Sequence, residues 1–346
     1  MPIVHLVSRP ASGGIRTHLE GLLADLPESG WDPVLHAPKT LLDSLYIKHP
    51  NISAFSLNIA PSLSQTDLNI GRKLASQVKS GSIVHAHGVR GAWIAAIARL
   101  FKHFRLIVTL HNVPPKGLAG QLAMYLISHT ADEVVCVSEM IARTSGIPGA
   151  LVIPNGVFCR EPIEQRRTMT DVTTSESFTA LCVSRLSYEK GVDLLLDAAK
   201  RLPEITFRIA GDGPLMDKLS EAAPENAAFL GQRDDIAELM ASADCVVAPS
   251  RSEGQGIVVL EAFAAGIPVV AASVGGLLES IVDGETGVLV EPENPSALAA
   301  GIDKLRNNRE LAEKMAGNAG NWVRQHRRRQ NQSARLAQLY ATRQQE

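Results

Sequence analysis

The stretch DCVVAPSRSEGQGIVVLEAFAAGIPVVAA, residues 244–272, reads as a strand, a turn, a helix and a second strand in that order. Apolar residues dominate 244–249 and 267–272, which predicts two buried strands. Between them the turn RSEGQG leads into a helix that Gly266 ends shortly before Pro268. Continuous apolar strands joined by helices are typical of a parallel sheet covered on both faces. The stretch therefore predicts an α/β fold.

The same alternation recurs along all 346 residues. Further predicted strands lie at residues 3–7, 82–87, 105–110, 133–137, 178–183, 205–210 and 286–291. The segment 159–177 is polar, charged and without periodicity, which favours a linker. We predict two doubly wound Rossmann-like domains, an amino-terminal one at 1–165 and a carboxyl-terminal one at 166–325, facing a central cleft. Ligands of such sheets bind beyond the carboxyl ends of the strands.

Composition excludes several classes of protein. A net charge of −2 gives no global signal for nucleic acid. The four cysteines form no C-x-x-C pair, which fits reduced thiols in the cytoplasm. We see neither a signal peptide nor a membrane-spanning segment. The arginine run 327–329 is interpreted as a solvated face, with a polyanion site as the alternative.

Two glutamates stand out in the opening stretch, because Glu253 lies in the glycine-bracketed turn and Glu261 lies inside the apolar helix. A buried carboxylate is costly unless hydroxyls or a positive charge meet it. A sugar diol suits Glu261, since a carboxylate accepts from two hydroxyls at once. The alternative is an ion pair with a core arginine or lysine. Gly254 and Gly256 let backbone amides at the helix start approach a ligand.

Two other loops carry anion-binding signals. Arg185 and Lys190 flank a turn between a strand and an amphipathic helix, where they can converge on one phosphate cluster or serve as ordinary surface cations. Gly13 and Gly14 follow the first strand and precede a helix, which suits either close approach to a ligand or a tight turn. Neither loop matches a G-x-G-x-x-G or Walker pattern.

Histidines end two of the predicted strands. His111 follows the strand at 105–110, where it can bond substrate hydroxyls or move a proton, or be structural. At least one of His85 and His87, in HAHG, is expected to be structural.

Taken together, these motifs resemble the retaining, nucleotide-sugar-dependent glycosyltransferases of family 4, which have the GT-B fold of two Rossmann-like domains. The resemblance covers almost the whole chain. Its most specific element is E-x7-E, at Glu253 and Glu261, followed by R-x4-K-G, which begins at Arg185. The glycine pair, TLHN, IPNGV and GDGP follow in the order expected of the family.

The resemblance implies a role for each candidate residue. Arg185 and Lys190 would hold the donor diphosphate, and Glu261 the donor ribose. The transferred sugar would meet Glu253 and the amides of the turn formed by Gly254, Gln255, Gly256 and Ile257. On the amino-terminal side, Gly13 and Gly14 would line the cleft, and His111 would meet both the donor sugar and the acceptor. The last segment, 326–346, would return to the amino-terminal domain as a helix.

The predicted activity is transfer of a sugar from a nucleoside diphosphate donor to an acceptor hydroxyl with retention of configuration, in polysaccharide or glycoconjugate synthesis. No D-x-D motif occurs, so we expect no metal and no cofactor, and fixed cations would stabilise the departing diphosphate. The alternatives are a nucleotide-sugar epimerase on the same fold and a non-catalytic nucleotide-sugar-binding protein.

Two departures from the family pattern concern specificity. Gln255 stands where an aromatic residue is common, which bears on donor choice, and Phe158 stands where an acidic residue is common. The acceptor is a glycan, a lipid-linked sugar or a small molecule. The basic and aromatic segment ARLFKHFRL, residues 98–106, suits contact with the inner face of a membrane, or else an ordinary amphipathic helix end.

Overall fold

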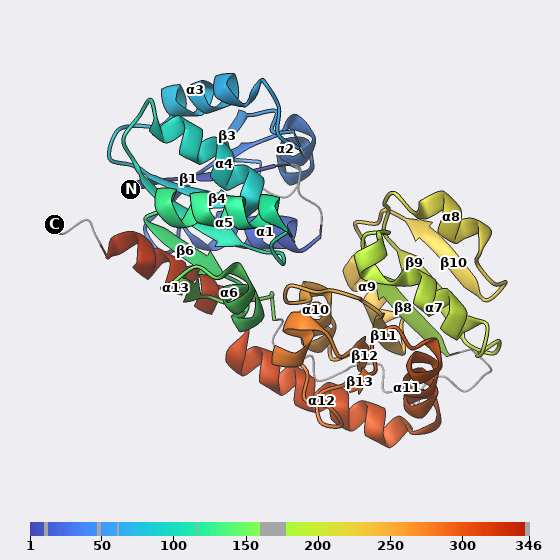
Figure 1. Ribbon diagram of the computed structural model, residues 1–346. Coiled ribbons are helices and arrows are strands. Elements are labelled where there is room, and N and C mark those ends of the chain that lie inside the picture. Colours follow the sequence, from blue (N-terminus) through green and yellow to red (C-terminus); the bar gives the residue numbers. More distant parts are fainter. Residues whose placement is uncertain (10–12, 47–49, 61, 116, 160–177, 343–346) are drawn as a thin grey trace. The chain divides into compact units, whose positions relative to one another are not determined.

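The computed structural model describes residues 1–9, 13–46, 50–60, 62–115, 117–159 and 178–342. The chain forms two compact units (Figure 1): unit 1 comprises Met1–Gly156 and Arg329–Glu346, and unit 2 comprises Val157–Arg328. The domain boundary predicted at 165 and all but the first residue of the predicted linker lie outside the described residues.

Unit 1 is built on a seven-stranded parallel sheet with the order β3-β2-β1-β4-β5-β6-β7. Its strands are β1 Ile3–Ser8, β2 Asp32–Ala37, β3 Ser53–Ser56, β4 Ile83–His87, β5 Arg105–Leu110, β6 Glu133–Cys136 and β7 Leu151–Val152. Its helices are α1 Gly14–Asp25, α2 Lys39–Tyr46, α3 Asp67–Gln77, α4 Gly88–Arg99, α5 Leu118–Thr130, α6 Glu139–Ser145 and α13 Arg329–Ala341.

The two faces of this sheet have separate cores. Successive side chains of a strand point to opposite faces. Val84 and Ala86 of β4 pack under α3, α4, α5 and α6. Ile83 and Ile107 pack instead under α1, α2 and α13. The odd-numbered residues of β4 and β5 therefore face α1 and α13, and this places the histidines described below.

Unit 2 has a six-stranded parallel sheet with the order β10-β9-β8-β11-β12-β13. Its strands are β8 Thr179–Val183, β9 Thr206–Ala210, β10 Ala227–Gly231, β11 Cys245–Ala248, β12 Val269–Ala272 and β13 Val288–Val290. Its α-helices are α7 Val192–Ala199, α8 Met216–Glu221, α9 Ile236–Ala241, α10 Ile257–Ala265, α11 Pro295–Asn307 and α12 Arg309–His326. Short 3-10 helices lie at Tyr188–Lys190 and Gly275–Glu279. Helices α7 and α11 lie side by side over one face (Figure 1), and α10 packs beside α12 on the other.

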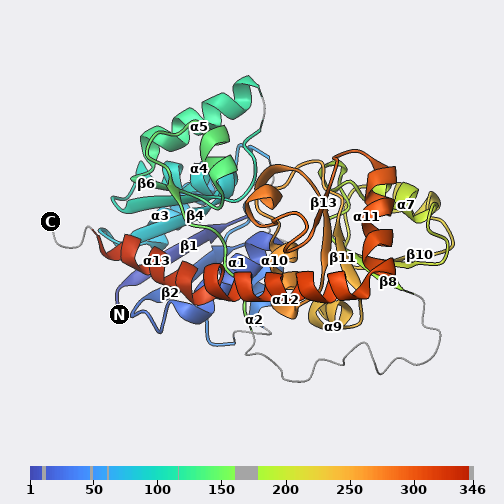
Figure 2. The same cartoon turned by 90° about the horizontal axis from the view of Figure 1, so that it is seen from below.

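Helix α13 belongs to unit 1 and packs beside α1 (Figure 2). Arg329 pairs with the buried carboxylate of Asp25 at 2.8 Å, and the Ser333 hydroxyl donates to the same carboxylate at 2.9 Å. The Tyr340 ring is fully buried. The interpretation of 327–329 as a solvated face is therefore wrong for Arg329. The chain enters unit 1 at this residue, and its guanidinium binds a buried carboxylate.

The segment 98–106, predicted to suit contact with a membrane, is only partly exposed. Leu100 and Phe101 are exposed, but Phe104 is fully buried. Arg105 begins β5 and donates to the Tyr340 carbonyl at 3.1 Å. The segment is thus the end of α4 followed by a core strand. Among the residues that the structure describes, no helix is long and apolar enough to cross a bilayer.

Candidate functional site

In unit 2, the turn between β11 and α10 is shaped by glycines. Gly256 has a φ of 78° at the start of α10, where an added Cβ would lie 2.4 Å from a Leu277 methyl group. The carbonyl oxygen of Gly254 lies 2.1 Å from where a Cβ on Gly276 would stand. Gln255 between them is buried. Ile257 is the first residue of the helix. The Leu277 side chain at Gly256 and the Gly254 backbone at Gly276 pack too closely for a side chain at either glycine.

Two predicted donor-binding residues meet at this turn. Lys190 Nζ donates to Glu253 Oε2 at 2.6 Å across 63 positions of sequence, and the Ser250 hydroxyl donates to the same oxygen at 3.1 Å. The side chain of Lys190 keeps 28% of its surface exposed, and that of Glu253 keeps 16%. The pair therefore stands partly open to solvent beside the start of α10, with one cation and one carboxylate at hand for a ligand.

Arg251, which we did not single out from the sequence, fastens the two loops together. Its guanidinium binds both carboxylate oxygens of Asp193 at 2.8 and 2.7 Å and lies 4.3 Å from the centre of the Tyr188 ring. Its backbone amide donates to the Glu189 carbonyl at 2.8 Å. A planar, bidentate contact of this kind fixes geometry well, so Arg251 holds the Lys190 loop against the Glu253 turn.

Arg185 lies on the same loop as Lys190, and Glu261 lies in α10, the helix that follows Glu253. Neither belongs to the Lys190–Glu253 pair. Arg185 is exposed at the start of the loop that follows β8. Hydrogen bonds from its own backbone and from Ser187, with smaller contributions from Arg185 and Lys190, hold the pKa of Glu189 below its ordinary value. Glu261 is half-buried within α10. Gly191 must be glycine, because a Cβ there would lie 2.1 Å from the Pro249 carbonyl oxygen.

The remaining predicted residues lie in unit 1. Gly13, with a φ of 58°, precedes α1, and Gly14 is its first residue. His111 directly follows β5 and contacts His18 of α1, with ring centres 4.7 Å apart. The structure thus divides the predicted residues into two groups, one in each unit.

His111 is part of a cluster of buried histidines that the sequence only hinted at. His87 Nδ1 lies 3.2 Å from His111 Nε2. His85 contacts the Tyr340 hydroxyl through Nδ1 and the Thr109 hydroxyl through Nε2, both at 2.6 Å. His18, on α1, was not identified as a candidate. The useful signal was the spacing H-x-H at 85–87 and T-x-H at 109–111, which puts four polar side chains on one face of two paired strands.

Burial decides the charge of these imidazoles. Desolvation lowers the pKa of His18 to about 4 and that of His85 to about 3. It also lowers the pKa of His87 and His111 well below their ordinary value, with further lowering by the neighbouring histidines. All four are therefore neutral near pH 7, each with a nitrogen lone pair.

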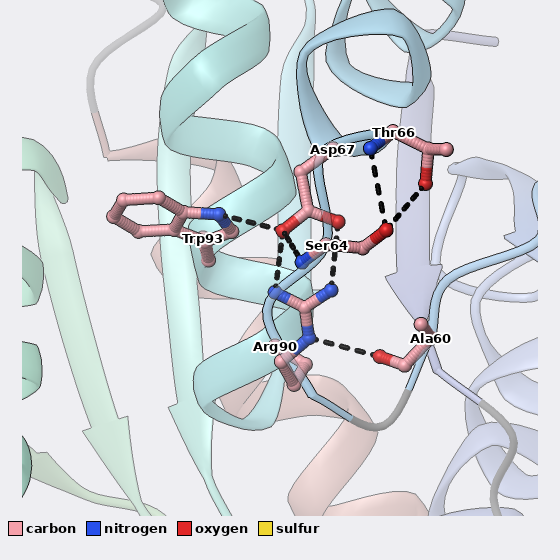
Figure 3. Close-up of polar contacts among 6 residues, drawn as sticks. All are labelled: Ala60, Ser64, Thr66, Asp67, Arg90 and Trp93. Carbon is pink, nitrogen blue, oxygen red and sulfur yellow. Dashed lines mark hydrogen bonds and ion pairs between the residues drawn. The ribbon is translucent and has the colours of Figure 1, made fainter.

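A second polar cluster in unit 1 is structural. Asp67 is buried, and its carboxylate accepts hydrogen bonds from Arg90, Trp93 and the Ser64 amide (Figure 3). The two bonds from Arg90 measure 2.9 Å, the one from the Trp93 ring 3.0 Å and the one from the Ser64 amide 3.2 Å. Arg90 also donates to the Ala60 carbonyl. A surface hollow of about 480 Å³ lies beside Asp67 and Trp93. Both oxygens of the carboxylate are already occupied, so the cluster fastens the start of α3 to α4.

Comparison with protein families agrees with this architecture. Residues 12–160 match the model described as Glycosyltransferase Family 4, and residues 168–322 match that of Glycosyl transferases group 1. Both matched models describe glycosyltransferases, and the two parallel sheets have the GT-B arrangement of two Rossmann-like units. The group 1 model covers residues 168–322, in the carboxyl-terminal half.

Individual relatives are similar over different lengths. An uncharacterized glycosyltransferase of Methanocaldococcus jannaschii is 32% identical over 61% of each chain. A GDP-mannose-dependent phosphatidylinositol monomannoside mannosyltransferase of Mycolicibacterium smegmatis is 26% identical over 96% of each. The matched part spans about three fifths of the length of the first curated relatives, 61% and 62%. Among solved structures, Anabaena HepE in complex with UDP-glucose superposes with a TM-score of 0.85 at 23% identity, over 99% of this chain and 100% of that one.

Proposed function

We propose that this protein transfers a sugar from a nucleoside diphosphate donor to an acceptor hydroxyl, with retention of configuration and without a metal ion. The observation that carries the proposal is the 2.6 Å contact between Lys190 and Glu253 at the start of α10. Lys190 is assigned to the diphosphate and Glu253 to the transferred sugar. In the donor these two groups are bonded to each other, so the residues that bind them should also be neighbours. Glycosidic bond cleavage builds negative charge on the diphosphate, and a fixed cation stabilises that charge.

The donor is proposed to lie along the β11–α10 turn. Amides at the start of a helix favour an anion, and Gly254 and Gly256 stand in the turn directly before these amides. The half-buried Glu261, further along α10, is assigned to the ribose hydroxyls. The names of the relatives suggest the first donors to test, because HepE was solved with UDP-glucose and the mycobacterial relative depends on GDP-mannose.

One experiment tests the proposal as a whole. A panel of UDP- and GDP-sugars is screened for thermal stabilisation, since a ligand that binds only the folded protein raises Tm. Donors that bind are then assayed for turnover in EDTA, with and without glycan and lipid-linked acceptors, and the anomeric configuration of the product is read by NMR. We expect acceptor-dependent transfer that survives EDTA. Turnover without acceptor would instead indicate an epimerase, and binding without turnover a binding protein.

The two glutamates should fail in different ways. Glu261→Gln removes charge from the ribose site, so it should weaken binding of the intact donor and of the nucleoside diphosphate alike. Glu253→Gln keeps an acceptor oxygen but loses charge beside the reacting sugar. It should leave nucleoside diphosphate affinity near wild type and lower transfer more than about tenfold, or about 1.4 kcal/mol.

Calorimetry with nucleoside diphosphate, run beside a transfer assay, separates these two defects. Glu313→Gln, an exposed glutamate on α12, is the matched control and should change neither. If Glu261→Gln lowered the free energy of unfolding but left affinity intact, Glu261 would serve a structural ion pair and the ribose assignment would fail.

Contact with a membrane surface is proposed for the same protein from the exposed apolar residues of α5. Leu118, Leu122 and Tyr125 are all exposed, and their spacing of four and three places them on one face of the helix. We expect Leu118→Glu with Leu122→Glu to lower co-sedimentation with anionic vesicles severalfold while leaving transfer to a water-soluble acceptor unchanged. Equal sedimentation of the variant and the wild type would count against this contact.

A further inference from the structure

We propose that His18, His87 and His111 form a binding site for one transition-metal ion of the zinc class within unit 1. Each of the three offers one ligand nitrogen, and these nitrogens all lie within 4.8 Å of one another. Imidazole nitrogen is a preferred ligand of Zn²⁺ and Co²⁺, whereas Mg²⁺ and Ca²⁺ prefer oxygen. The chemistry of the donor set therefore selects the metal class.

The geometry of two of the ligands already suits the ion. In a tetrahedral site with Zn–N bonds of about 2.0–2.1 Å, ligand nitrogens lie about 3.3 Å apart. His87 Nδ1 and His111 Nε2 lie 3.2 Å apart. The third ligand atom lies within 4.8 Å of the other two, so it has at most about 1.5 Å to move to reach tetrahedral spacing.

The third ligand is oriented by a neighbour. His18 Nδ1 lies 2.7 Å from both Asn155 Oδ1 and Gln332 Nε2. Gln332 Nε2 is an amide donor that also bonds to Asn155 Oδ1 at 3.1 Å. In the tautomer that donates from Nδ1 to Asn155 Oδ1, the Gln332 amide bonds to that oxygen instead of to the ring, and the lone pair lies on Nε2, a buried atom with no hydrogen-bond partner. A histidine that binds metal through one nitrogen characteristically donates the other to such an acceptor. The arrangement thus presents Nε2 of His18 to the other two histidines.

A comparison within unit 1 shows what distinguishes this group. His5 Nδ1 lies 2.9 Å from His36 Nε2, so those two rings are as close as His87 and His111. In the described part of the chain, however, His18, His87 and His111 are the group that brings three potential ligand atoms together. His85 is excluded as a ligand because Tyr340 and Thr109 occupy both of its nitrogens. Three ligands and an open fourth position suffice for zinc.

The site has a consequence that rests on the proposed function. His111 is assigned there to the donor sugar and acceptor, and a metal bound to its Nε2 makes that nitrogen unavailable to them. Zn²⁺ should therefore inhibit transfer, and a chelator should restore it. Metal binding is measured without any donor, so failure of the metal site and failure of the transferase assignment are separate results.

The test uses the untagged full chain. Zn²⁺ is titrated against a chromophoric chelator in excess Mg²⁺, and Co²⁺ is followed by its visible spectrum. We expect one ion per chain, with a spectrum of nitrogen and oxygen ligands. His18→Gln and His87→Gln should each weaken binding about 100-fold or more, since loss of a second-shell partner alone costs about 10–100-fold.

His103→Gln and His129→Gln are matched controls, because both histidines are exposed. They should leave affinity and stoichiometry unchanged. Absence of stoichiometric binding to the wild-type chain would overturn the site, even if the His18 and His87 variants did not fold. A thiolate charge-transfer band with Co²⁺, or wild-type affinity in folded His18→Gln, would assign the metal to other residues and equally overturn it.

Discussion

Lowering the pH from 7 to 5 should unfold unit 1 while unit 2 remains folded. Among the described residues of unit 1, six histidines are buried, namely His5, His18, His36, His85, His87 and His111. The only histidine in unit 2 is His326. Burial lowers the pKa of His5 to about 4 and that of His36 to about 3, as it does for the cluster around His111.

The sign of the effect follows from proton binding. Between the lowered pKa of the folded state and the ordinary value of 6.5, the unfolded chain binds more protons than the folded one. The contribution of these histidines to the free energy of unfolding is therefore largest above pH 6.5, and it decreases as the pH falls toward 4. Each buried histidine contributes about 2 kcal/mol of loss by pH 5. Six such losses approach the whole stability of a typical domain.

Urea denaturation at pH 7.5, 6.0 and 5.0 measures this, with tryptophan fluorescence as the probe. Trp31 and Trp93 report on unit 1 and Trp322 on unit 2, so Trp322→Phe isolates the first signal. His85→Gln should reduce the slope of stability with pH by about 1.4 kcal/mol per unit. His103→Gln, on the surface, should not. An equal loss in both units would show that the buried histidines are not the cause.

Removing either cation of the Lys190 loop should cost about 10²–10³ in kcat. Arg185→Ala and Lys190→Ala each remove a positive charge that stabilises the departing diphosphate. Losing one such charge-stabilising donor typically lowers kcat about 10²–10³-fold. Affinity for the nucleoside diphosphate should fall less, because the interaction strengthens in the transition state.

The chain supplies matched controls for this pair. Lys200 and Arg201 are exposed in the same unit, and Lys200→Ala and Arg201→Ala should keep wild-type rates. Lys190→Arg tests charge against shape, since it keeps the cation but changes its geometry. Steady-state kinetics beside calorimetry separates kcat from affinity. Wild-type kcat in both Arg185→Ala and Lys190→Ala would remove the phosphate assignment.

The fold could be predicted because its strands are buried on both faces. Each apolar run named from the sequence is a strand, including β8 Thr179–Val183 and β12 Val269–Ala272. Four of the described strands were missed. Strands β3 Ser53–Ser56, β7 Leu151–Val152 and β10 Ala227–Gly231 lie at sheet edges and are short or partly exposed. Strand β2 Asp32–Ala37 is an inner strand, but polar residues and a proline interrupt its sequence DPVLHA.

Local patterns alone bring together only residues that are close in sequence, whereas Lys190 and Glu253, 63 positions apart, were assigned to one donor site through the family resemblance. Glu253 and the glycines around it share one turn, so their proximity is local. Arg251 and Asp193 are 58 positions apart, and nothing in either segment indicates a bidentate pair. The same holds for His18 and Asn155, 137 positions apart. Such contacts depend on sheet order and helix placement, which no local pattern contains.

The return of α13 to unit 1 sets the order in which the two units can finish folding during synthesis. Leu336 and Tyr340 belong to the core of unit 1, and Gln332 accepts a hydrogen bond from the Gly156 amide. The ribosome makes these residues only after all of unit 2, and domains generally fold as units while the chain emerges. Unit 2 can therefore complete its fold first. Unit 1, although begun earlier, waits with part of its core uncovered until α13 leaves the exit tunnel.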